Sequence, residues 1–509
     1  MTLPALIVTG ASGFIGRHLL DRLKERYRIY GIARRSQRRS GAPIHPNVTW
    51  FQVDIADRAS LEHAFRRIGE EGGADTVVHL AAHYDFTGIE VPEYQRTNVD
   101  GLRNVLECSR ELGIKHLVFS SSVAACQFPS PGRTVDETSP PTGDHIYAKT
   151  KAIGEEMVKE YEAHFSSVIV RFAALFSDWC EYPPLFKFLE TWLSSKWNQR
   201  ILAGKGQSAI PYLHVLDGID FLQRLLKRLD ETKPGQIVVC SGDGSTTHLE
   251  LFVAATHYHF GEYIKAIFMP RPLVKPGVHV RCLIGRMSGE MPFERPWMVE
   301  YIDERLDIDA TNTREWLGWE PKERREIIRR LPFLLENRKV EPVEWIRRNH
   351  AAMKQYRVRP NLQIHSLLGA HAEEISAEYT RALEERAHRG DLPSYGHVTH
   401  REHEWNHKLI LRHLMNAVLT QERGVFISYC RDLAERRFDQ GYKAHELASA
   451  VQELGWVCLR ILGEDEEGRE LVGLLHGQIM STVLFGCDEV YETFETLEAS
   501  RPISEAAPH

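Results

Sequence analysis

The chain has 509 residues, 43% of them hydrophobic and 26% charged, an ordinary globular composition with enough length for more than one domain. The net charge of −7 gives no general basic field for nucleic acid, and the eight cysteines contain no Cys-x-x-Cys pair that would indicate a disulfide framework or a cysteine zinc site. Because we find neither a signal-peptide pattern nor an apolar run of about 18 residues, we expect a cytoplasmic protein that does not interact with membranes.

Strands and helices alternate along the first third of the chain. Apolar, β-rich runs predict strands at Ala5–Val8, Arg28–Ala33, Thr49–Val53, Thr76–Leu80, His116–Ser120 and Ser167–Phe172. Helical periodicity separates them, at Ile15–Arg26, Ser60–Ile68, Gln95–Leu112 and Tyr147–His164. The alternation predicts an α/β fold, a Rossmann-type doubly wound parallel sheet that binds ligands at the carboxyl ends of its strands.

A glycine-rich stretch joins the first expected strand to the first expected helix. Gly10 permits a tight turn, Gly13 lets backbone N–H groups approach a pyrophosphate, and Gly16 lets the helix pack closely on the strand. The order of strand, glycine turn and helix favours dinucleotide binding over an ordinary turn. The residues expected to hold the cofactor here are Gly10, Ser12, Gly13, Phe14, Ile15 and Gly16.

The end of the second strand indicates which dinucleotide is bound. An acidic residue there would accept hydrogen bonds from the adenosine ribose, but this chain has Arg34 and Arg35, and guanidinium groups suit a 2′-phosphate. We therefore predict NADP, with NAD as the alternative. If the arginines only form a solvent-exposed charged stretch before a loop, they do not indicate which cofactor binds. Asp54-Ile55 is expected to flank the adenine, and Leu80-Ala81-Ala82 to lie along the cofactor.

Three residues form a candidate catalytic group. Ser122 closes the fifth strand, and Tyr147 and Lys151, four residues apart, share one face of the helix that follows. A lysine ammonium beside the phenol is expected to lower the tyrosine pKa and make it a usable acid or base. The serine hydroxyl can orient a substrate carbonyl or alcohol.

These motifs together resemble the extended short-chain dehydrogenase/reductase family, which includes NAD-dependent epimerases and dehydratases. The resemblance covers roughly residues 1–335. It implies catalysis by Ser122, Tyr147 and Lys151, with Asn98 supporting the active-site helix and Lys151 also touching the nicotinamide ribose. The residues that carry it are Gly10-Ala11-Ser12-Gly13-Phe14-Ile15-Gly16, Asp54-Ile55, His79-Leu80-Ala81-Ala82, Asn98-Val99-Asp100-Gly101, Ser120-Ser121-Ser122, and Tyr147 with Lys151.

The resemblance leaves the substrate open. Ser122-Val123-Ala124 departs from the pattern of many sugar dehydratases and counts against dehydration, and the Gly-Pro-Arg-like loops of many sugar-nucleotide enzymes are missing. Tyr84-Asp85-Phe86-Thr87 offers an aromatic wall beside the expected nicotinamide, although a packed loop explains it equally well. We expect a cofactor part over residues 1–175 and a substrate part over 176–335.

Helical patterns alone follow from about residue 340. After a linker at 336–362 we expect an all-α bundle over 363–500 and a flexible tail at 501–509. The expected helices are Leu362–Ala387, His400–Glu422, Val425–Phe438, His445–Leu462 and Glu466–Leu484. The bundle is similar in pattern to sensor bundles of bacterial stress-response regulators. Of His397, His400, His403 and His407, the last three recur at three and four residues and could share a helical face. A polar helix start with partly exposed histidines explains them as well, and we predict no metal site.

The leading hypothesis is an NADP-dependent oxidoreductase that moves a hydride between nicotinamide and a carbonyl or secondary alcohol of a small molecule. An epimerase with a retained cofactor is the first alternative, and it would consume no NADPH. The second is an NADP(H)-binding redox sensor that signals to a partner through the helical bundle. A homodimer is compatible with the resemblance.

Overall fold

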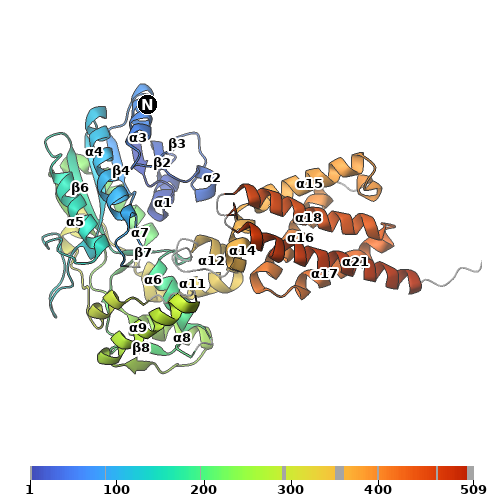
Figure 1. Ribbon diagram of the computed structural model, residues 1–509. Coiled ribbons are helices and arrows are strands. Elements are labelled where there is room, and N and C mark those ends of the chain that lie inside the picture. The colour runs from blue at the N-terminus through green and yellow to red at the C-terminus, as the bar shows by residue number, and fades with distance from the viewer. Residues whose placement is uncertain are drawn as a thin grey trace, which may run out of the picture. The chain divides into compact units, whose positions relative to one another are not determined.

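The computed structural model describes residues 3–85, 88–194, 197–288, 294–349, 360–397, 400–465, 468–469 and 471–500. The chain forms two compact units, Met1–Arg357 and Val358–His509, and each is described by itself. In Figure 1 the first unit contains the central sheet with its helices, and the second consists of helices. The predicted fold class, a doubly wound parallel sheet followed by an all-α unit, is confirmed.

A seven-stranded sheet with the order β11-β6-β5-β4-β1-β2-β3 lies at the centre of the first unit, and all its strand pairs are parallel. The order reverses at β1 and β4, so the carboxyl ends of these two strands flank a crevice where such sheets bind ligands. The strands are β1 Ala5–Thr9, β2 Arg28–Ala33, β3 Val48–Gln52, β4 Thr76–His79, β5 His116–Ser122, β6 Ser166–Phe172 and β11 Gln236–Cys240.

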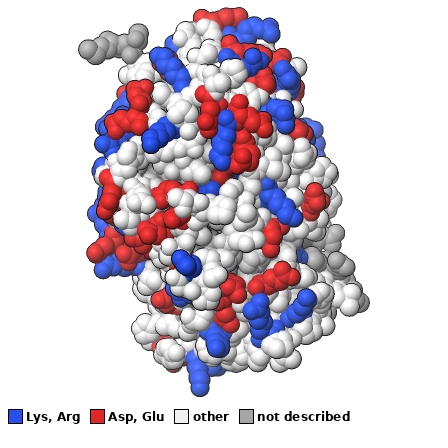
Figure 2. Space-filling view, turned by 90° about the vertical axis from the view of Figure 1, so that its left-hand side faces the viewer, with Lys and Arg blue, Asp and Glu red and all other residues white. Residues whose placement is uncertain are grey.

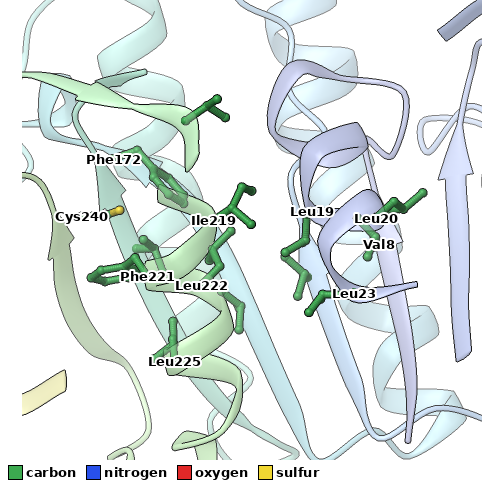
Figure 3. Close-up of a cluster of buried hydrophobic side chains, with 14 of the residues drawn as sticks. Val8, Leu19, Leu20, Leu23, Phe172, Ile219, Phe221, Leu222, Leu225 and Cys240 are labelled. Carbon is green, nitrogen blue, oxygen red and sulfur yellow. The ribbon is translucent and has the colours of Figure 1, made fainter. Parts of the chain in front are cut away.

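Helices cover both faces of this sheet because its strands are apolar on both sides. On one face, Leu6 and Val8 belong to a buried cluster with α1 (Phe14–Leu23) and α7 (Val215–Leu226). Figure 3 shows the leucines of α1 and the Ile219, Leu222 and Leu225 side chains of α7 in this cluster. On the other face, Ile7 packs with α3 (Arg58–Glu70), α4 (Gly101–Leu112) and α5 (Ile146–Lys159).

The expected helix at Gln95–Leu112 has two parts. A π-helical stretch η1, Tyr94–Asp100, precedes α4 and carries Asn98. Single π-helical turns inside longer helices are frequent at functional sites. The expected helix at Tyr147–His164 ends earlier, at Lys159.

Beyond residue 173, the described part of the first unit also contains three small sheets and further helices. The sheets pair β7 (Ala174–Phe176) with β10 (Tyr212–His214), β9 (Ala209–Ile210) with β12 (Thr246–Thr247), and β8 (Ile201–Ala203) with β13 (Ile267–Met269). The helices are α6 Pro183–Trp192, α8 His248–Phe260, α9 Arg271–Ser288 and α10 Thr311–Leu317.

Part of the segment that we expected to be a linker is folded onto the first unit. After α11 (Ile327–Val340), helix α12 (Pro342–Arg348) buries Trp345, which is 3% exposed and lies 6.2 Å from the Phe186 ring of α6. The Asn349 amide donates to the Trp179 carbonyl at 2.7 Å, and its side-chain oxygen accepts from the Glu181 N–H at 2.9 Å. These contacts tie α12 to the loop at 177–182.

A chain that ends at residue 357 is expected to fold and to bind cofactor, whereas a chain that ends at residue 340 is expected to be less stable. The shorter chain lacks Trp345, and removing a buried tryptophan typically costs about 3–5 kcal/mol. Thermal unfolding followed by circular dichroism measures the difference. Equal melting temperatures for the two chains would show that α12 contributes nothing to the first unit.

The described part of the second unit contains helices α14 (Pro360–Ala370), α15 (Ala372–His388), α16 (His400–Thr420), α17 (Gly424–Asp439), α18 (Ala444–Glu464), α20 (Val472–Leu475) and α21 (Ser481–Ser500), a 3-10 helix η6 (Pro393–His397) and a π-helical stretch η7 (His476–Met480). Its core forms where α17 and α18 pack on α21. Helices α17 and α21 approach each other closely, since a Cβ at Gly486 of α21 would lie 2.6 Å from the Phe426 ring of α17.

Two helix boundaries in the second unit differ from the prediction. The expected helix at Leu362–Ala387 is broken between α14 and α15. The expected helix at Glu466–Leu484 is helical from Val472 on, with the π-helical stretch η7 between α20 and α21, and it continues to Ser500, while Glu466, Glu467 and Glu470 lie outside the described residues. The helical periodicity of the sequence runs through the break after α14 and past Leu484, so it could locate neither the break nor the helix end.

The expected histidine cluster lies largely outside the described residues, because the side chains of His397, His400 and His403 are not described. His407 is described and hydrogen-bonds to Thr380 at 2.7 Å, with its ring 4.5 Å from Tyr379. Among the described residues, no group of three or more His, Cys, Asp or Glu could hold a metal ion.

The surface charge of the molecule and the apolar character of its helices bear on whether nucleic acids or membranes are partners. Lys/Arg and Asp/Glu side chains are interspersed over the face in Figure 2, so this face does not carry a field of one sign. Within the described part of the chain, no helix has the length and apolar character needed to cross a bilayer.

Candidate active site

The glycine-rich loop lies at the carboxyl end of β1, in the crevice of the sheet. Gly10 has a φ of +68°, and a Cβ there would come within 2.6 Å of the Ala81 amide nitrogen. A Cβ at Gly16 would lie 2.8 Å from Ala11 Cα. Only glycine therefore fits at these two positions. The loop leads directly into α1 with an extended Gly13 at its N-terminal boundary, which suits the phosphates of a dinucleotide.

The other expected cofactor residues lie at the same edge of the sheet. Arg34 and Arg35 are exposed after β2, and Arg35 donates to the Ser12 carbonyl oxygen at 2.5 Å. Asp54 follows β3, but its carboxylate accepts a hydrogen bond from Arg96 at 2.7 Å. Ile55 beside it is buried. Phe14 and Ile15, half-buried, begin α1, and Leu80-Ala81-Ala82 follows β4 and packs beside Gly10.

The structure brings the three expected catalytic residues together where β5 ends and α5 begins. Lys151 is 3% exposed, and its ammonium donates to the Ser120 carbonyl oxygen at 2.6 Å. The same nitrogen lies 5.7 Å from the centre of the Tyr147 ring. Ser122 ends β5 and hydrogen-bonds to Tyr147. A hydroxyl, a phenol and an ammonium thus lie within reach of one another.

Burial controls the protonation of this group. Removal from water raises the pKa of Tyr147 above its ordinary value, while the hydrogen bond with Ser122 acts in the opposite direction. Burial also lowers the pKa of Lys151 to about 8, with Glu155 acting against it. The expectation of a lowered phenol pKa is therefore wrong for this arrangement. Tyr147 is protonated at neutral pH, the form that can donate a proton.

Asn98 holds two parts of the site together. Its side-chain carbonyl accepts from the His83 N–H at 2.6 Å, and its amide donates to the His83 carbonyl and to Thr150 Oγ1, both at 3.0 Å. His83 follows β4 and Thr150 lies on α5, one residue before Lys151. Asn98 thus links the segment after β4 to α5, next to Lys151.

A buried ion pair beneath the site was not found from the sequence. Arg171 on β6 and Glu155 on α5 are both fully buried, and two hydrogen bonds of 3.0 and 2.8 Å join them. Ser121, next to Ser122, donates to the same carboxylate at 2.5 Å. The pair fixes α5 against β5 and β6. A Glu four residues after Lys151 is too common on helices to have been a useful signal.

Aromatic side chains surround Tyr147. The Tyr84 ring lies 4.1 Å from it and the His145 ring 6.2 Å, and Trp297 stacks on His145 at 5.6 Å. Tyr182 and Tyr147 both contribute to raising the pKa of Tyr84, and Tyr147 also contributes to raising the pKa of Tyr182. The three phenols therefore lie close together. Tyr84 belongs to the aromatic block predicted from the sequence, of which Phe86 and Thr87 lie outside the described residues. His145 and Trp297 were missed because no local pattern links them.

The first part of the chain is similar in sequence to known proteins. Residues 6–241 match the model of the NAD dependent epimerase/dehydratase family. A UDP-glucose 4-epimerase from Streptococcus mutans is 31% identical over 159 residues, which span 30% of this chain and 46% of that protein. An N-acetyl-alpha-D-glucosaminyl-diphospho-ditrans,octacis-undecaprenol 4-epimerase from Escherichia coli O157:H7 is 24% identical over 310 residues, 60% of this chain and 87% of that protein.

The solved structures show the same fold. The UDP-glucose 4-epimerase of Thermus thermophilus in complex with NAD superposes with a TM-score of 0.50 at 22% identity, over 65% of this chain and 99% of that chain. The family match ends at residue 241, before α8, α12 and the whole second unit.

Proposed function

We propose that this chain is an NADP-dependent oxidoreductase acting on a carbonyl or secondary alcohol of a small molecule, a proposal supported by the match of residues 6–241 to the NAD dependent epimerase/dehydratase family. The observation that carries the proposal is the meeting of Ser122, Tyr147 and Lys151 beside the glycine-rich loop. Gly10 and Gly16 pack directly against neighbouring backbone of the protein, which gives the tight strand-turn-helix geometry of dinucleotide-binding loops.

The residues of the site have distinct roles in this proposal. A bound nicotinamide would supply or accept the hydride. Ser122 hydrogen-bonds the substrate oxygen and orients it. Tyr147, protonated through its burial, donates a proton to that oxygen in the direction of reduction. Lys151, anchored on the Ser120 carbonyl, holds a positive charge near the phenol and stabilises negative charge that develops there.

The choice of NADP rests on Arg34 and Arg35 at the end of β2. Replacing Arg34 with aspartate is expected to weaken NADPH binding by about tenfold or more, since a hydrogen bond to a charged group contributes about 1.5–3 kcal/mol. NADH binding should change less. Fluorescence titration of the substrate-free protein with each cofactor measures both affinities.

The control for this variant is Arg66→Asp, which reverses an exposed charge on α3. It should leave both affinities nearly unchanged. If the parent protein bound NADH and NADPH equally well, the assignment of NADP to the two arginines would be wrong.

An epimerase is the second candidate, because both relatives named above are 4-epimerases. Absorbance at the NADPH band during a screen of carbonyl compounds, alcohols and sugar nucleotides separates the two functions. An oxidoreductase changes the band in proportion to product, whereas an epimerase forms product with no net change. The aromatic rings around Tyr147 favour substrates with an apolar or planar face.

A further inference from the structure

Four arginines gather around the start of α1. Arg17 lies on the first turns of α1 with 19% of its side chain exposed, and its guanidinium forms an ion pair with Glu181. Arg35 reaches the same loop through the Ser12 carbonyl. Arg347 and Arg348, at the end of α12, are the other two, and they come from outside the segment that matches the family.

The loop at 177–182 connects α12 to α1. Glu181, which pairs with Arg17, donates its N–H to the Asn349 side chain at 2.9 Å. The Arg348 guanidinium lies 5.3 Å from the centre of the Trp179 ring in the same loop. The end of α12 is therefore held beside the part of α1 that follows the glycine turn.

This loop has an unusual backbone. Cys180 and Glu181 have φ values of 72° and 57°, in the left-handed region that costs roughly 1–2 kcal/mol for each non-glycine residue. Hydrogen bonds in both directions between Ser177 and Cys180 hold the shape, and Ser177 Oγ donates to the Glu181 carboxylate at 2.6 Å. The strain fixes Glu181 between α1 and α12, and such strain is characteristic of functional sites.

The arginines around this loop share few carboxylates. Glu344 pairs with both Arg347 and Arg348, at 2.6 and 2.5 Å, and Glu181 pairs with Arg17. Asp178 of the same loop pairs with Arg330. The described ion pairs of the loop and α12 thus join four guanidiniums to three carboxylates, and the excess positive charge is one that a pyrophosphate would complement.

The crowding also shows in the neighbouring titratable groups. Burial, followed by the charges of Arg348, Arg35 and Arg347, lowers the pKa of Arg17 to about 9. Burial, with smaller contributions from the charges of Arg17 and Arg348, lowers the pKa of His18 to about 4. The fold therefore keeps like charges together at a cost that a bound anion would relieve.

We propose that Arg347 and Arg348 of α12 join Arg17 in binding the pyrophosphate of the dinucleotide. The assignment rests on the proposed function, because that function requires the dinucleotide in the crevice beside the glycine-rich loop. Guanidiniums bind phosphate oxygens through two parallel N–H groups, and Arg347 and Arg348 keep 40% and 30% of their side chains exposed for such contacts. In this chain a helix beyond the family segment thus completes the cofactor site.

The test uses the full chain without substrate and measures dissociation constants for NADPH and NADH by fluorescence titration. Arg347→Gln and Arg348→Gln are each expected to weaken both cofactors to a similar degree, on the order of tenfold. Similar losses follow from a contact with the pyrophosphate, which the two cofactors share. The melting temperature of the ligand-free variants should stay the same or rise, since each substitution removes a crowded charge.

The matched control is Arg110→Gln. Arg110 is 42% exposed in the last turn of α4 and pairs with Glu107 three residues earlier at 2.8 Å, as Arg347 pairs with Glu344. The proposal is overturned if the α12 variants bind both cofactors as tightly as Arg110→Gln does. It is also overturned if only NADPH binding weakens, because α12 would then contact the 2′-phosphate. A parent protein that binds neither cofactor would overturn the proposed function itself, and this assignment with it.

Discussion

Tyr147→Phe is expected to lower turnover by about 10²–10⁴-fold while leaving cofactor affinity almost unchanged. The substitution removes one hydroxyl, so the proton donor and its hydrogen bond with Ser122 are lost. The ring remains, and it keeps its packing against Tyr84 and its position beside the Lys151 ammonium. Steady-state kinetics with a substrate from the screen, together with a cofactor titration, measure the two effects separately.

The matched control for this prediction is Tyr84→Phe. It also removes a phenol hydroxyl, from a ring 4.1 Å from Tyr147, so general effects on the aromatic wall should be similar. We expect this control to retain turnover within about tenfold of the parent, since it does not remove the general acid. Parental turnover in Tyr147→Phe would refute the mechanism even with the fold correct.

Arg171→Leu is expected to destabilise the first unit by about 3–5 kcal/mol, because it leaves the Glu155 carboxylate buried without its partner. Ser121 would remain the carboxylate's hydrogen-bond donor, and the bond from Arg171 to the Ser139 carbonyl at 2.7 Å would also be lost. A change of this size moves the midpoint of urea unfolding by about 1 M or more. Unfolding of the full chain in urea measures it.

Two further variants show whether the loss of stability comes from the unpaired Glu155 carboxylate. Arg171→Leu/Glu155→Leu removes both charges and should recover much of the lost stability, since apolar replacements of buried ion pairs are often neutral. Arg110→Gln breaks an exposed pair and should cost no more than about 1 kcal/mol. If Arg171→Leu unfolded at the parental midpoint, the ion pair would not hold α5 in place.

The proposed role of α12 changes how the first unit should be divided from the second. The shift from alternating strands and helices to helices alone placed the boundary near residue 335, but Trp345 and Asn349 bind α12 to α6 and to the loop at 177–182. A chain shortened at that expected boundary would lose Arg347 and Arg348 together with the packing of Trp345. Its cofactor affinity should therefore fall together with its stability.

Sequence patterns were enough to predict the parallel sheet, the glycine turn, the pairing of Tyr147 with Lys151 on one helix face and the helical character of the second unit. These features are local, because strand and helix periods, glycine positions and an i, i+4 pair depend on neighbouring residues. Tertiary packing accounts for the remaining features. It raised the pKa of Tyr147 through burial, joined Arg171 to Glu155, and placed Trp297 beside His145 and Arg348 beside α1. Desolvation and contacts between distant segments depend on how the whole chain packs, and no local pattern encodes them.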